Sequence, residues 1–158
     1  MPLSKSEIAA HRRTMARCFN EAWAYLDRKR RNVEEERRML DLAHTARHMA
    51  RIAGTWRNQA IGDWQVSRVY AAMGEARLAL KYARSSVGIC RTRQLSDLLG
   101  TAWEAVARAQ AVGGHTGQAG KSLDRARRIL DRLSLAADDR DVFAEQIADT
   151  ARLIRGRR

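Results

Sequence analysis

The chain has 158 residues, 45% of them hydrophobic, and a formal net charge of +12. This length fits a single domain with one core, and the hydrophobic fraction excludes a globally disordered protein. No apolar run approaches the roughly 18 residues that cross a membrane. Cys18 and Cys90 lack CxxC spacing and no signal-peptide core follows the N-terminal basic residues, so we expect a cytoplasmic protein with reduced thiols.

Two helices are predicted in the N-terminal third, because apolar residues recur there at spacings of three, four and seven. The first is expected over about Lys5–Lys29. Asn32 has the form of an N-cap for the second, with Glu35 three residues later as its reciprocal partner. The second helix is expected to end at Ala53, with Gly54 as a left-handed C-terminal cap.

Five further helices carry the same periodicity, at about Trp56–Met73, Ala76–Cys90, Ser96–Val112, Gly117–Leu133 and 138–155. Ser96 and Asp138 are expected to be N-caps, and Gly74 to end the first of these five helices. Four glycines fall inside helices, where each costs roughly 1 kcal/mol relative to alanine and indicates close helix contact: Gly62, Gly88, Gly100 and Gly120. The sequence therefore predicts an all-α fold of about seven antiparallel helices in one domain, 1–158.

Two stretches of the chain read as copies of one unit, Val66–Ser86 and Val106–Ala126. They align without a gap at an offset of 40 residues, which is typical of stacked helical pairs. The identical pairs are Val66/Val106, Arg68/Arg108, Ala71/Ala111, Gly74/Gly114, Ala79/Ala119 and Lys81/Lys121.

This unit resembles the tetratricopeptide repeat (TPR), with Tyr70 at the aromatic position and Trp103 at the tryptophan position. Small residues fall where the two helices of each unit cross, at Ser67, Ala79, Ala83, Ser86, Ala107, Ala119 and Ala126. The match covers about 63–130, and small uncharacterised bacterial proteins of this class look similar. The resemblance implies a short right-handed stack, a TPR-like α-solenoid. Its expected parts are an N-terminal helical pair over 5–53, units at about 56–91 and 95–133, and a capping helix over 138–155.

In this repeat class the first helix of each unit lines a concave groove. The resemblance places Trp64 and Arg68 there from one unit, and Thr101, Glu104 and Arg108 from the other. Residues four apart share a helical face, and two guanidinium groups above an indole could bind a carboxylate or phosphate. The leading prediction is a protein-interaction module that binds an acidic peptide or a small anionic ligand.

A structural alternative accounts for the same residues. Trp64 would belong to the core, and the arginines would pair with Asp63 and Glu104. An open repeat stack also leaves apolar end faces, which is compatible with a homodimer.

Nucleic-acid binding is a second functional alternative, through convex or terminal basic residues. The excess of positive charge is spread over the whole chain instead of one segment, which does not favour this alternative. The segment 113–122 also resembles a phosphate-binding loop, but His115 stands where the first glycine is required. We interpret it as a repeat turn.

A third alternative is a small helical enzyme or metal protein, with a site across the second, third and fifth helices. Its residues would be His44, His48, Asp63, Arg68 and Glu104. A second candidate pocket consists of His44, His48, Asn58 and Asp63. The two histidines have a spacing that can reach one metal, but Arg47 and Arg51 beside them would repel a cation. We therefore predict no metal, no cofactor and no catalytic residue.

Overall fold

The computed structural model describes residues 2–157, and in that range it contains seven α-helices and no β-strand. They are α1 (Lys5–Leu26), α2 (Val33–Ala53), α3 (Trp56–Ala72), α4 (Ala76–Thr92), α5 (Ser96–Val112), α6 (Thr116–Leu130) and α7 (Ala137–Gly156). The all-α fold predicted from helical periodicity is confirmed. None of the described helices combines the length and apolar character needed to cross a membrane.

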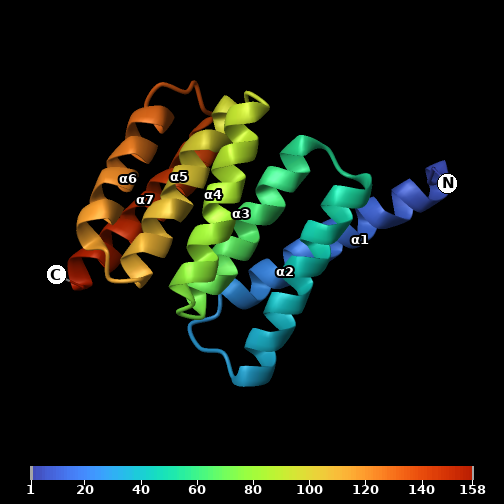
Figure 1. Cartoon of the computed structure of the whole chain (residues 1–158), viewed down its shortest axis with the longest axis horizontal. Coiled ribbons are helices and arrows are strands. Elements are labelled where there is room, and N and C mark those ends of the chain that lie inside the picture. Colours follow the sequence, from blue (N-terminus) through green and yellow to red (C-terminus); the bar gives the residue numbers. More distant parts are fainter. Residues whose placement is uncertain (1, 158) are drawn as a thin grey trace.

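Each helix packs antiparallel against the next, so the chain progresses from α1 and α2 on one side to α6 and α7 on the other (Figure 1). In addition, α1 contacts α3, α3 contacts α5, and α5 contacts α7. We call these four odd-numbered helices the inner layer. The outer layer consists of α2, α4 and α6, each of which packs across two successive inner helices.

Small side chains fill the crossings between helices, and most of the buried apolar residues are alanines. Gly62 and Gly100 lie at tight contacts. A Cβ atom would lie 3.1 Å from the Cα of Arg47 at Gly62, and 2.6 Å from the Cγ of Leu130 at Gly100. The expectation of close helix contact is wrong for Gly88 and Gly120, because no atom lies within 4 Å of a Cβ added at either position.

Three successive turns, after α3, α4 and α5, share one backbone geometry. The residue before each next helix donates its N–H to a carbonyl five residues earlier, at 2.8–2.9 Å. Gly74 and Gly114 occupy the left-handed position with φ of 81°, and Gln94 occupies it in the middle turn with φ of 55°. Gly74 therefore ends its helix as expected, and 113–122 contains a turn and the start of α6.

The reciprocal N-cap of α2 is confirmed. The backbone N–H of Glu35 donates to Asn32 at 2.8 Å, and the N–H of Asn32 donates to Glu35 at 2.9 Å. Gly54 is not left-handed, because its φ of −92° and ψ of −179° are extended. A glycine is favoured here because the backbone passes close to α2. A Cβ atom at position 54 would lie 2.6 Å from the carbonyl oxygen of Ala50.

Other predicted helix ends shift by a few residues. Ser96 is the first residue of α5 and Asp138 lies in the first turn of α7, and neither helix has a side-chain N-cap bond. At Asp138 the favourable helix dipole replaces capping. Helix α1 ends at Leu26, before the predicted Lys29, and Arg31 donates to the carbonyl oxygens of Tyr25 and Leu26 at that end.

Candidate functional site

The inner layer borders an open groove whose floor is α3 and α5 and whose walls are α1 and α7. In the described chain, no Cα atom of α1 lies within 8 Å of one in α7. Two pockets lie in this space, and each is lined by residues of all four inner helices. We call this space the inner groove. One pocket lies toward the start of α5, at Leu98 and Thr101, and the other toward its end, at Val112.

The buried carboxylate of Glu104 lies between these two pockets on α5 and lines neither of them. It accepts hydrogen bonds from Arg68 Nη1 at 3.0 Å and from Arg108 Nε at 3.2 Å. Thr150 of α7 donates its hydroxyl to the same carboxylate at 2.5 Å. This Glu104 cluster therefore joins α3, α5 and α7. For Arg68 and Arg108 the structure matches the alternative in which they pair with Glu104.

Arg68 also contacts two indole rings that stack on each other. Its guanidinium carbon lies 5.6 Å from the ring centroid of Trp23 and 5.5 Å from that of Trp64. The two indoles stack at 5.4 Å, and Phe19 stacks on Trp23 at 6.4 Å. Burial lowers the pKa of Arg68, and the carboxylate of Glu104 acts in the opposite direction. The ion pair and the rings together fix the orientation of this arginine.

The pocket near the start of α5, which we call the apolar pocket, has a volume of about 240 Å³. Its walls include Phe19, Ile61 and Phe143. Thr101 lines it and is only 8% exposed, and its Oγ1 has no hydrogen-bond partner among the described residues. The buried Nε1 of Trp64, which lines the same pocket, has none either. Both groups can donate a hydrogen bond, so both lack an acceptor.

A second apolar space of about 250 Å³ adjoins this pocket, because Phe19 and Ile61 line both. Asn58, proposed as a pocket residue from the sequence, lines this adjoining space. Its side-chain oxygen accepts hydrogen bonds from the backbone N–H and hydroxyl of Thr55, at 3.0 Å each. Asn58 therefore has a structural role at the start of α3.

The pocket near the end of α5, which we call the charged pocket, has a volume of about 450 Å³. Its cationic side chains are Arg68, Arg108 and Arg157, and its acidic ones are Asp27 and Asp149. The Nη2 atom of Arg108 is buried without a hydrogen-bond partner. One guanidinium nitrogen of the groove thus remains unsatisfied although the Glu104 carboxylate is fully engaged.

Asp63 lies away from the inner groove. Its buried carboxylate contacts Arg47 Nε at 2.5 Å, the hydroxyl of Ser85 at 2.5 Å and Arg51 Nη2 at 3.8 Å. These partners come from α2 and α4, so Asp63 joins the outer layer to α3. The structural alternative is wrong for Asp63, because its partners are Arg47 and Arg51 of α2 and neither Arg68 nor Arg108 pairs with it.

The two histidines of α2 do not share a site. His44 Nε2 lies 3.1 Å from the hydroxyl of Tyr70, and the ring also packs edge-on against Tyr82. Burial, with the nearby charge of Arg47, lowers the pKa of His44. His48 is exposed. Among residues 2–157, no group of three or more His, Cys, Asp or Glu side chains is placed to hold a metal ion.

Sequence reasoning missed the groove contributions of Trp23 and Thr150. Both lie outside the repeated segment, so no alignment of the two units could place them. The spacing of Phe19 and Trp23, four apart on one helical face, was a signal of a shared surface, but it fits ordinary packing equally well. Comparison adds nothing further, since no family model, curated protein or solved structure matches this chain.

Proposed function

We propose that this chain is a TPR-like interaction module that binds a short peptide segment of a partner protein in the inner groove. In this proposal α3–α4 and α5–α6 are two repeat units of a short right-handed stack, α1–α2 is a preceding pair, and α7 is the cap. A left-handed glycine in the turn inside each unit, Gly74 and Gly114, supports equivalent units, whereas the turn between the units has Gln94 at this position. Repeat stacks commonly use such concave surfaces for binding.

The chemistry of the groove favours a peptide with one large apolar side chain as its anchor. The apolar pocket has the size and lining for such a side chain. Both donor atoms are buried in the free chain, so a peptide oxygen would accept hydrogen bonds from Thr101 and Trp64 after their side chains turn toward the pocket. Binding pockets commonly combine an apolar lining with a few polar groups of this kind.

An acidic group of the peptide would lie in the charged pocket, near Arg108. Because Glu104 already neutralises one of the two floor arginines, a ligand there meets a smaller positive charge than two free guanidinium groups would present. The acidic component is therefore secondary to the apolar anchor. A small anionic ligand could occupy only this end of the groove.

The observation that carries the proposal is the unpartnered hydroxyl of Thr101 in the apolar pocket. An unsatisfied buried polar group costs about 1–3 kcal/mol. A bound acceptor removes that cost, whereas an unliganded packing role gives no reason for a hydroxyl at this position.

The test uses peptides selected from a random phage-displayed library on the immobilised full-length chain. We expect enriched sequences to share a large apolar residue together with an acidic one. The isosteric Thr101→Val variant removes only the hydroxyl. It should weaken binding of a selected peptide about tenfold in calorimetry while leaving the free energy of unfolding equal or higher.

The matched control is Arg77→Ala on α4, which should bind the selected peptide like the unaltered chain. Failure to enrich any sequence, or equal affinity of the Thr101→Val variant, would contradict the proposal.

A further inference from the structure

The outer layer carries a stripe of exposed cations along α4. Arg77, Lys81, Arg84 and Arg91 are all exposed and follow one another at spacings of four, three and seven residues. Such spacings place side chains on one face of a helix. We call these four residues the cationic stripe. With a rise of 1.5 Å per residue it extends over roughly 21 Å.

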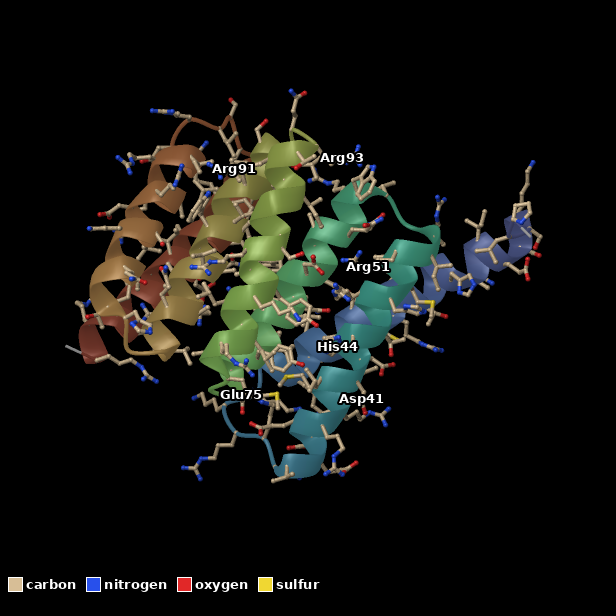
Figure 2. All side chains as sticks on the ribbon, in the orientation of Figure 1. Asp41, His44, Arg51, Glu75, Arg91 and Arg93 are labelled. Carbon is tan, nitrogen blue, oxygen red and sulfur yellow. The ribbon has the colours of Figure 1, made fainter. Side chains whose placement is uncertain are left out.

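The stripe lacks neutralising partners. Helix α4 contains no acidic residue, and within the described chain none of the four stripe cations forms a salt bridge. Figure 2 shows Glu75 at the opposite end of α4 from Arg91 and Arg93. Asp97, just beyond the end of the helix, is bound by Arg57 at 2.5 Å.

The other two outer helices differ from α4. Helix α2 begins with three glutamates, and on α6 Arg127 pairs with Asp124. Among the described residues, cations without a salt bridge also occur on α1 and α6, but these helices carry acidic residues as well, whereas α4 carries none. Helix α4 therefore presents a row of cations with no acidic side chain of its own helix among them.

A small pocket interrupts the stripe at Gly88, which lies on the same helical face between Arg84 and Arg91. No atom lies within 4 Å of the position that a Cβ of Gly88 would take. The pocket has a volume of about 280 Å³, and its other walls include Trp56 and Arg93. Trp56 is 47% exposed, and the guanidinium carbon of Arg93 lies 3.7 Å from its ring centroid.

We propose that this face binds single-stranded nucleic acid, with phosphates along the cationic stripe and one base in the pocket between Gly88 and Trp56. A row of cations beside an exposed aromatic ring is the combination by which proteins hold single strands. A base in a duplex is paired and stacked, so it cannot enter such a pocket. This surface lies on the outer layer and does not depend on the peptide proposal for the inner groove.

The first test measures binding of a fluorescein-labelled 20-mer oligouridylate by anisotropy at a series of salt concentrations. Four phosphate contacts predict a slope of log affinity against log salt of roughly −3 for single strands. Replacing Arg77, Lys81 and Arg84 together with alanine should reduce the slope to about −1. No binding at low salt would overturn the proposal.

A matched control removes the same charge from α6 and the segment after it, by replacing Lys121, Arg128 and Arg132 with alanine. These side chains are also exposed. The control should keep the salt slope of the unaltered chain. An equal loss in both triple variants would show that only total charge matters and would overturn the assignment to α4.

The second test addresses the base pocket. Gly88→Leu fills open space and replaces glycine with a better helix former, so the variant should remain folded. Both Gly88→Leu and Trp56→Ala should weaken oligouridylate binding about tenfold. Neither should change binding of inorganic polyphosphate, which has phosphates but no bases.

Three outcomes would contradict the assigned ligand. Equal affinity for a 20-base-pair duplex, or unchanged oligouridylate binding by both pocket variants, would exclude base recognition. Tighter binding to phosphatidylserine vesicles with the same dependence on the stripe would show that the surface is a lipid-binding face instead.

Discussion

The arginines of α3 and α5 and those along α4 are in opposite environments. In the inner layer, Arg68 and Arg108 share the buried carboxylate of Glu104 and are held in place by it. In the outer layer, Arg77 and Arg84 face solvent without an acidic partner. The formal net charge of +12 is a sum over the whole chain, so it does not give the charge of either surface. What matters for binding is which cations folding leaves without a partner.

A related contrast holds for the two buried carboxylates, of which Glu104 joins inner helices to one another and Asp63 joins α3 to the outer layer. Glu104 binds two arginines that are themselves nearly buried, with 12% and 19% of their side chains exposed. Asp63 binds Arg47 and Arg51, whose side chains are 23% and 44% exposed. Loss of the acidic partner should thus have different consequences, because only the partners of Asp63 can readily turn toward water.

The largest effect is expected for Glu104→Gln. This change leaves two mostly buried guanidinium groups without a carboxylate, and should lower the free energy of unfolding by about 3 kcal/mol. Urea denaturation followed by circular dichroism measures it.

Asp63→Asn is the isosteric counterpart on the outer side and should cost less, about 1–2 kcal/mol. The same denaturation experiment compares the two variants directly. If Asp63→Asn lowers the free energy of unfolding more than Glu104→Gln does, the expected difference between the two carboxylates is wrong.

Glycines provide a comparison of packing in the two layers. Gly100→Ala in α5 places a methyl group against Leu130 and should destabilise the protein by about 1–2 kcal/mol. Gly120→Ala in α6 meets no atom and should stabilise it by roughly 0.5–1 kcal/mol, because alanine is the better helix former. Melting temperatures that shift in the same direction for both variants would contradict a tight contact at Gly100 and open space at Gly120.

The smallest effect is a pH dependence in the outer layer. Burial lowers the pKa of His44 from its ordinary 6.5, so on acidification the unfolded chain takes up this proton before the folded chain does. Stability should be full above pH 6.5 and should fall as the pH drops below it. His44→Gln should lose less stability between pH 7.5 and pH 5.5 in urea titrations than the unaltered chain. His48→Gln, at an exposed position, should retain the full difference.

Helical periodicity was sufficient to predict seven helices, and the repeat alignment was sufficient to place Arg68 and Arg108 on equivalent helix faces. Pairing of those arginines with Glu104 was an alternative in the sequence, but the sequence could not choose it over a free groove, because the choice depends on how closely α3, α5 and α7 approach. The repeat alignment also could not predict which helices form the walls of the groove, because α1 and α7 are not part of the repeated segment.

The errors at helix ends have a common physical origin. Gly54 reads as a left-handed cap and Ser96 as an N-cap because those residue types favour such positions. The structure uses Gly54 for a close backbone approach and begins α5 through the turn that follows Gln94. Local preference was overridden in both places by how consecutive helices pack.

The most direct test of the central claim follows the tryptophan indole N–H signals in ¹H–¹⁵N spectra while a library-selected peptide is added. Trp64 lies in the inner groove and Trp56 on the outer face, so the two signals report on different surfaces. Binding in the groove predicts that the Trp64 signal shifts as its unpartnered N–H gains an acceptor, while the Trp56 signal stays in place. A shift at Trp56 with no change at Trp64 would contradict the inner groove as the peptide site.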